Sequence, residues 1–186
     1  MIDPVTPPEL RHDPGGKVRL QIDPTIKSQA VFSQCGRYRQ LLVRTWDSSA
    51  PPVLFIGMNP STADAYVDDP TVRRECNFAR DWGFGSLVKT NVMDYRATCP
   101  GDLLVPGVAA QTEANLEEIQ RWVHHCPTVV VAWGRIPSSL QHCVTLVKNI
   151  LQKSLVHPQC LGRNLDRSPR HPLYLKRNST LEPFEW

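Results

Sequence analysis

Two short segments, far apart in the chain, carry side chains suited to binding a small polar group. The first, Val53–Ser61, is an apolar run that ends in a glycine, an amide and a proline. Gly57 permits a close backbone approach, and the Asn59 side chain, with one acceptor and two donors, can hold a water while it binds another polar group. The second segment, Ser168–Leu175, places His171 between a basic residue and a proline-led apolar sequence. These types of residue predict a polar binding site.

Each of these features also has an ordinary structural explanation. Glycine, asparagine and proline are the residues expected in a turn that follows a strand. Asn91, at the end of the apolar segment 87–92, could equally cap the strand end, and a lone histidine beside a proline is often structural. The two interpretations stay open for each motif taken alone.

The elements that must position these side chains follow from the hydrophobic pattern. Short apolar runs alternate with helical patterns, which is typical of a parallel sheet with crossover helices. Strands are predicted at 53–56, 87–92, 128–132 and 155–161, and helices at 70–82, 112–125 and 138–153. A hairpin is expected around 34–36, between 30–32 and 38–46. The fold class expected is therefore α/β, with three α/β/α layers around a short central parallel sheet.

In such a sheet, ligands bind beyond the carboxyl ends of the strands. Gly57–Ser61, Asn91–Arg96 and Trp133-Gly134 all fall at such ends. Tyr95 and Arg96 could line a pocket or contact phosphate. Asp68 and Asp69 precede the helix at 70–82, and helix capping explains them most simply. Asp64 remains the better candidate for a chemical role, as a general base or as an acceptor.

The length and composition bound the domain organisation. The chain has 186 residues, which suits one domain of 30–186 preceded by a proline-rich arm or irregular lead-in at 1–29. No apolar stretch approaches the roughly 20 residues of a membrane span, and the first residues lack a secretory pattern. We therefore expect a cytoplasmic protein without a membrane partner.

Charge and cysteine content restrict the partners. From Trp133 onward there are eight Lys/Arg residues against three acidic residues, which is compatible with a surface that faces phosphates but also with a merely solvated tail. The six cysteines never form a C-x-x-C pair, so neither a zinc site nor an iron–sulfur cluster is expected.

Taken together, Val53–Ser61, Leu87–Val92 and Ser168–Leu175 resemble the active-site motifs of the uracil-DNA glycosylase superfamily. The resemblance implies that Asn59 positions the attacking water, that Asn91 binds the edge of a flipped base, and that His171 faces the base oxygen that gains charge. The best-known uracil enzymes carry a tyrosine where this chain has Ser61, so a wider pocket is expected. A longer string, Gly57-Met-Asn-Pro-Ser-Thr-Ala-Asp64 with the terminal His-Pro-Leu-Tyr-Leu, resembles bacterial and phage proteins tied to anti-phage glycosylases that act on glucosylated hydroxymethylcytosine.

The same resemblance implies the remaining functional assignments. Substrate contacts are expected from Gly57, Met58, Ser61, Asp64 and Asn91, and DNA contacts from Arg167, Ser168, Arg170, Leu173 and Tyr174. Leu173 or Tyr174 would be the apolar wedge that enters the duplex.

The expected activity is that of a monofunctional enzyme that leaves an abasic site in double-stranded DNA carrying a modified base. We expect a monomer without cofactor or metal, and no lysine in a position to form a Schiff base. Two alternatives are a non-catalytic reader of modified DNA and a nucleoside or nucleotide N-glycosidase.

Overall fold

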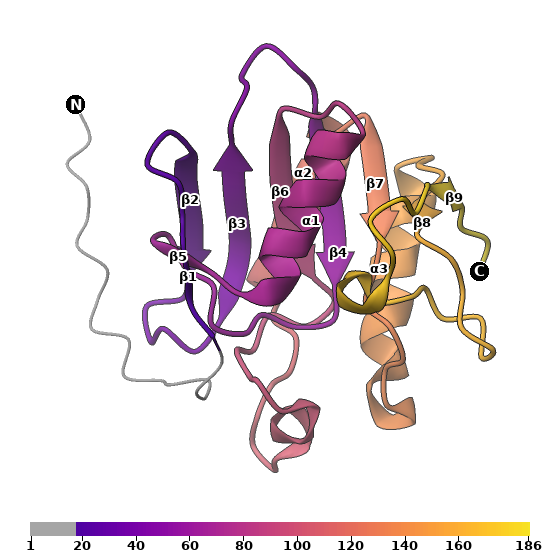
Figure 1. The fold of residues 1–186 in the computed structure, drawn as a ribbon. Helices are drawn as coiled ribbons and strands as arrows, with labels where there is room; N and C mark the ends of the chain where they lie inside the picture. The colour runs from indigo at the N-terminus through magenta and orange to yellow at the C-terminus, as the bar shows by residue number, and fades with distance from the viewer. Residues whose placement is uncertain (1–17) are drawn as a thin grey trace.

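A seven-stranded mixed sheet forms the centre of the protein in the computed structural model, which describes residues 18–186. The strand order is β2-β3-β6-β4-β7-β8-β9 (Figure 1). The strands are β2 (Lys27–Phe32), β3 (Arg39–Thr45), β4 (Pro52–Gly57), β6 (Ser86–Asn91), β7 (Thr128–Val131), β8 (Gln159–Cys160) and β9 (Glu182–Pro183). A separate two-stranded sheet pairs β1 (Leu20–Gln21) with β5 (Val67–Asp68).

The inner strands β6, β4, β7 and β8 are parallel, as the alternation of apolar runs and helical patterns predicts. The edges are antiparallel, because the β2–β3 hairpin adds to β6 and β9 adds to β8. The sheet is therefore larger than the short parallel sheet expected. It also begins at Lys27, inside the segment expected to be an irregular lead-in, whereas residues 1–17 of that segment lie outside the described residues.

Helices cover both faces of the sheet, which confirms the α/β class. Helix α1 (Pro70–Asp81) lies on one face, in front in Figure 1, while α2 (Glu113–His125) and α3 (Gln141–Lys153) lie behind. Alternate residues of β4 explain the two faces: Val53 and Phe55 belong to the core beneath α1, and Leu54 and Ile56 to the core beneath α2 and α3. Short 3₁₀ turns occur at η1 (Pro100–Leu104), η2 (Ser138–Leu140) and η3 (Pro172–Tyr174).

The helix ends follow the predicted chemistry. The Asp69 carboxylate accepts a hydrogen bond of 2.9 Å from the Val72 N–H at the start of α1, so Asp69 rather than Asp68 is the cap. Gly83 adopts a φ of 83° just after the helix, a conformation that a side chain would strain. Thr112 caps α2 in the same way as Asp69 caps α1.

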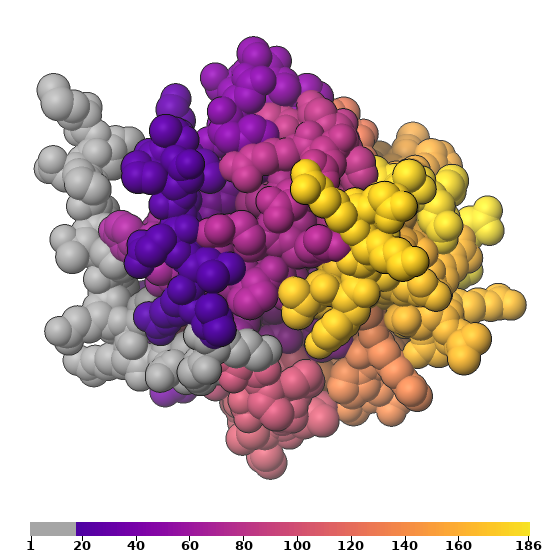
Figure 2. Space-filling view, in the orientation of Figure 1, coloured from indigo at the N-terminus to yellow at the C-terminus, as the bar shows by residue number. Residues whose placement is uncertain are grey.

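The C-terminal segment crosses from the β8 edge of the sheet to α1. Figure 2 shows this yellow segment lying against the magenta surface of α1. Residues far apart in sequence are thereby brought to one end of the sheet. In the described part of the chain, no helix is both long and apolar enough to cross a membrane.

Candidate functional site

A cavity of about 370 Å³ lies at the carboxyl ends of β4 and β6, within the size range of small-molecule sites. Its wall comes from β3, the β4 and β6 ends, the start of α1, the loops after β6 and β7, and η3. Gly57 and Asn91 lie opposite each other at this end, since they are paired in the β4–β6 register. The topology therefore brings the end of strand β4, the end of strand β6 and the His171 segment to one point.

The three side chains predicted to share a site all line this cavity. Asn59, Asn91 and His171 come from three separate segments and contribute to the same wall. Five further candidates lie there with them: Gly57, Met58, Ser61, Leu173 and Tyr174. The predicted side chains therefore line one cavity, and the contacts of each one determine what it can bind.

The Asn59 amide is held in one orientation. Its Nδ2 donates to the carbonyl oxygens of Ala97, at 2.8 Å, and Pro60, at 3.0 Å. Both N–H groups are therefore used, and among residues 18–186 no donor contacts Oδ1. That oxygen can accept a hydrogen bond from a water or a ligand.

Asn91 is buried with an unused amide. The residue is only 1% exposed, and neither Oδ1 nor Nδ2 has a hydrogen-bond partner among the residues the structure describes. Leaving such a group unpaired costs about 1–3 kcal/mol for each buried donor or acceptor. Asn115 Nδ2 donates to the main-chain oxygen of Asn91 at 2.9 Å and so fixes the strand end. The Asn91 amide is therefore prepared to bind a donor–acceptor pair on a ligand.

Gly57 makes room for two polar groups. A Cβ atom at this position would lie 2.4 Å from Lys89 Nζ and 2.9 Å from Asn91 Oδ1. Both distances are shorter than real contacts allow, so a side chain would displace one of these groups. Glycine is thus required here for the close approach of polar atoms, in addition to ending the strand.

His171 is placed by the turn that follows it. The Leu173 N–H donates to His171 Nδ1 at 3.4 Å, and His171 thereby caps η3. Because Nδ1 uses its lone pair in this bond, the neutral ring carries its proton on Nε2. Gly134, at a φ of 71°, packs beside the histidine, with its Cβ position 3.5 Å from His171 Cβ. The turn therefore fixes the imidazole in the cavity wall, where such a ring is suited to binding a ligand oxygen.

Buried charges at the inner end of the cavity are the feature that the sequence analysis missed. Lys89 Nζ and Glu75 Oε1 are 2.6 Å apart, and both side chains are buried. Burial raises the pKa of the Glu75 carboxyl, and the Lys89 charge opposes this shift. Arg39 also lines the cavity, and its burial lowers the pKa of the guanidinium to about 10. A lysine therefore lies in the cavity wall. The sequence had indicated no lysine in a position to form a Schiff base.

Asp64 does not line the cavity. Its Oδ1 accepts hydrogen bonds from the N–H groups of Tyr66, at 2.7 Å, and Val67, at 3.0 Å. This carboxylate therefore closes a local turn ahead of β5, and a direct contact with substrate does not fit its position.

Tyr95 and Arg96 lie outside the cavity lining as well. Tyr95 packs edge-on to Tyr38, with ring centroids 5.5 Å apart. Arg96 is buried and donates to the Gly36 oxygen at 3.1 Å. Of the two roles left open for this pair, neither a pocket wall nor an exposed phosphate contact fits Arg96.

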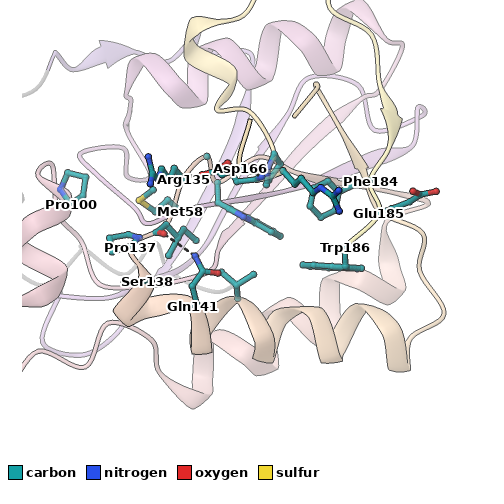
Figure 3. Close-up of a pocket in the computed structure, with 17 residues that line it drawn as sticks. Met58, Pro100, Arg135, Pro137, Ser138, Gln141, Asp166, Phe184, Glu185 and Trp186 are labelled. Carbon is teal, nitrogen blue, oxygen red and sulfur yellow. Dashed lines mark hydrogen bonds and ion pairs between the residues drawn. The ribbon is translucent and has the colours of Figure 1, made fainter. Parts of the chain in front are cut away.

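The expected DNA-contacting residues lie in three places. Arg167 and Ser168 line a second cavity of about 730 Å³, which is larger than the first and is shown in Figure 3. Arg170 is exposed on the surface and donates to the Arg163 oxygen at 3.0 Å. Leu173 and Tyr174 lie at the first cavity, where Tyr174 is 85% exposed and Leu173 is 36% exposed.

The second cavity adjoins the first through shared wall residues. These are Met58, Pro100, Trp133, Gly134 and Arg135. Figure 3 shows Trp186 and Phe184 at its far end, and the Trp133 and Trp186 rings stack with centroids 5.9 Å apart. Arg135 and Asp166 form an ion pair of 3.4 Å within this wall. The second cavity thus offers aromatic surface together with charges of both signs.

The residues described contain no group of three His, Cys, Asp or Glu side chains placed to hold a metal ion. The polar groups that line the first cavity include amides, an imidazole and buried charges.

A protein-family model matches the chain. The model of a family described as "Protein of unknown function (DUF1643)" matches residues 37–173, which is most of the chain. The chain belongs to this family. The match extends from the start of β3 to His171 and Leu173, and so includes nearly all of the cavity wall. No curated protein and no solved structure matches the chain.

Proposed function

We propose that the protein is a DNA glycosylase, which extrudes one modified pyrimidine nucleotide from duplex DNA and hydrolyses its N-glycosidic bond. The observation that carries the proposal is the convergence of Asn59, Asn91 and His171 on one cavity. An extruded pyrimidine would supply the donor–acceptor pair that the buried Asn91 amide lacks. We also assign the fold to the uracil-DNA glycosylase class, since the cavity lies at the carboxyl ends of the parallel strands β4 and β6 and beside the loop after β7.

Each side chain has a role consistent with its surroundings. Asn59 Oδ1 would accept a hydrogen bond from the attacking water, because its Nδ2 is held by Ala97 and Pro60. His171 would donate from Nε2 to the base oxygen that becomes negative as the bond to C1′ breaks. A single donor of this kind lowers such a barrier by about 3–4 kcal/mol. The proton balance is simple: water adds its hydroxyl to C1′, and its proton ends on the departing base.

The proposed substrate class is a pyrimidine with a large substituent, with glucosylated hydroxymethylcytosine of phage DNA as the leading candidate. Two observations support a large base. Ser61 leaves space in the wall of the first cavity, and the second cavity adjoins the first through Met58 and Trp133. The enzyme would act as a cytoplasmic monomer in anti-phage defence and leave an abasic site.

The test is an excision assay with purified protein. Duplexes would carry uracil, a thymine mismatch, or plain, hydroxymethylated or glucosylated cytosine, and alkali would convert abasic sites to strand breaks. We expect breaks with at least one modified base. His171→Ala and Asn59→Ala should each lower the rate by about 100-fold or more, with DNA affinity nearly unchanged. His157→Ala, at an exposed histidine, is the matched control.

Other outcomes would assign other functions. Tight binding to modified DNA with no abasic product would identify a reader of modified DNA. Cleavage of free nucleosides but not of DNA would identify an N-glycosidase of metabolites. Normal excision by both the His171 and the Asn59 variant would show that these roles are wrong.

A further inference from the structure

The Lys89–Glu75 ion pair lies at the inner end of the first cavity and has no part in the mechanism above. Lys89 precedes Asn91 by two residues in β6, so both side chains point to the same face of the sheet. Lys89 belongs to the cavity wall although its side chain is only 4% exposed. Anything that contacts the Asn91 amide therefore has its deeper edge near the ammonium group.

The ammonium group has unused hydrogen-bonding capacity. A lysine carries three donors, and within residues 18–186 the only acceptor that contacts Lys89 Nζ is Glu75 Oε1, at 2.6 Å. The empty Cβ position of Gly57 lies 2.4 Å from Nζ and 2.9 Å from Asn91 Oδ1, so this ammonium and this amide border the same small space. Replacing a buried ion pair by apolar residues often costs nothing or stabilises the protein. Stability alone therefore does not account for this pair.

We propose that Lys89, held in place by Glu75, determines base specificity by donating a hydrogen bond to an oxygen on the deep edge of the extruded base. The inference rests on the proposed function and adds to it a chemical requirement for the substrate. Asn91 accepts and donates, so it can pair with either kind of pyrimidine edge. Lys89 only donates. The base must therefore present an oxygen acceptor beside the atoms that Asn91 binds.

Because His171 is assigned to the O2 atom of the base, this requirement excludes plain cytosine. On the edge beyond its N3 atom, cytosine carries the N4 amino group, which is a donor, whereas uracil and thymine carry the O4 acceptor. A cytosine whose 5-position bears a hydroxymethyl or glycosyloxymethyl group regains an oxygen acceptor on that edge. Two substrate classes, the 4-carbonyl pyrimidines and the oxygen-substituted cytosines, would thus satisfy the ammonium. An enzyme that must spare the cytosines of its own DNA needs such a distinction.

The role assigned to Lys89 is binding and not nucleophilic attack. A nucleophilic amine would displace the base from C1′, form a Schiff base with the sugar and lose its proton in the process. Lys89 Nζ lies 2.6 Å from Glu75 Oε1, and this contact directs the amine toward α1 rather than leaving it unpaired in the cavity. Borohydride should therefore trap no covalent complex between the protein and DNA.

The experiment compares three proteins on matched duplexes. Glu75→Gln removes the charge that holds Lys89 and leaves the lysine buried without its partner. The double variant Lys89→Met with Glu75→Gln removes the ion pair without leaving a buried charge alone, and its melting temperature verifies the fold. The duplexes carry uracil, 5-hydroxymethylcytosine, glucosylated hydroxymethylcytosine or plain cytosine. Each is also prepared with a 2′-fluoro sugar, which resists cleavage and allows affinity to be measured.

Wild type should prefer an oxygen-bearing base to plain cytosine by about 100-fold or more, the scale of one buried donor. Glu75→Gln should weaken this preference, because it removes the partner that positions Lys89 Nζ. The double variant should retain less than about one tenth of this preference, in affinity for the 2′-fluoro duplexes as well as in rate. Comparison of the uracil duplex with the two substituted cytosines then identifies which oxygen Lys89 contacts.

Failure of the inference and failure of the proposed function give different results. An unchanged preference in a folded double variant would overturn the role of Lys89 and leave the glycosylase assignment intact. If wild type cleaves none of the duplexes, the proposed function fails, while the affinity measurements still show whether Lys89 reads the base. A borohydride-trapped complex that disappears in the double variant would replace the binding role by a nucleophilic one.

Discussion

Arg177 and Asp81, which are 96 positions apart, form a bidentate ion pair that binds the C-terminal segment to the end of α1. Arg177 Nε donates to Asp81 Oδ2 at 2.9 Å, and Nη2 donates to Oδ1 at 3.0 Å. A second attachment is the hydrogen bond from Arg74 to the main-chain oxygen of Leu175. Contacts with α1 therefore hold the turn that carries His171 at the cavity.

Weakening this attachment should loosen the His171 turn. The hydrogen bond from Arg177 lowers the pKa of the Asp81 carboxyl. A carboxyl with a lowered pKa stabilises the folded state above its unfolded pKa, near 3.9, and loses that effect as the pH falls through its folded value. Asp81→Asn should therefore raise KM about twofold to fivefold with little change in kcat at neutral pH, since exposed pairs contribute little.

The pH dependence separates this effect from a general loss of stability. The difference in melting temperature between wild type and Asp81→Asn should begin to shrink as the pH falls below about 4, and it should vanish below the lowered pKa of the folded state. Asp47→Asn is the matched control, because the Ser49 hydroxyl, and not an arginine, lowers the pKa of Asp47. A constant difference between wild type and Asp81→Asn from pH 3 to pH 7 would show that the ion pair does not fasten the segment.

Ser61 offers a test of the width of the cavity. Its hydroxyl is buried in the wall without a hydrogen-bond partner among the described residues, so removing it breaks no contact. Ser61→Ala should leave the excision rate unchanged. Ser61→Tyr should lower excision of a glucosylated base by about 10-fold or more, because overpacking of this kind costs 1–3 kcal/mol. Excision of uracil, which is smaller, should fall much less, and equal losses on both substrates would mean that Ser61 does not set the width.

The sequence predicted those elements whose signals are local. The strands β4, β6 and β7 and the three long helices lie where the apolar pattern and the caps place them, within a few residues. The strand expected at 155–161 is reduced to Gln159–Cys160. Leu155 is 85% exposed with a φ of 56°, so its apolar character indicates no burial. Hydrophobic pattern alone does not distinguish an apolar loop from a short buried strand.

The sequence predicted where the polar side chains of the candidate site lie, but it did not predict the buried ion pair beside them. Asn59 and Asn91 follow strands, and the ends of parallel strands meet at one edge of a sheet. The Lys89–Glu75 pair joins a strand to a helix across the core, and such non-local pairing leaves no sequence signal except the two-residue spacing to Asn91. Asp64 was predicted to contact substrate, but its carboxylate closes a turn outside the cavity. The sequence does not distinguish a carboxylate that closes a turn from one that binds a ligand.

Leu173 and Tyr174, the two candidates for the side chain that enters the duplex, differ in how exposed they are at the first cavity. Tyr174 is 85% exposed and Leu173 is 36% exposed, so Tyr174 extends further from the surface that would meet DNA. An inserted side chain fills the space left by the flipped base and offsets the cost of unstacking, which is a few kcal/mol. Tyr174→Ala should therefore lower single-turnover excision from duplex DNA by about 10-fold or more, and Leu173→Ala by much less.

The same variants on single-stranded DNA provide the decisive comparison, because a base that is not stacked in a duplex needs little extrusion. There, Tyr174→Ala should excise nearly as fast as wild type. This arm also controls for the histidine, since the His171 and Tyr174 rings are 5.8 Å apart and a disturbed His171 would slow excision from both kinds of DNA. Tyr174→Phe should behave as wild type because it keeps the ring. If Leu173→Ala shows the larger, duplex-specific loss, then Leu173 is the wedge, and exposure in the free protein does not identify the residue that enters DNA.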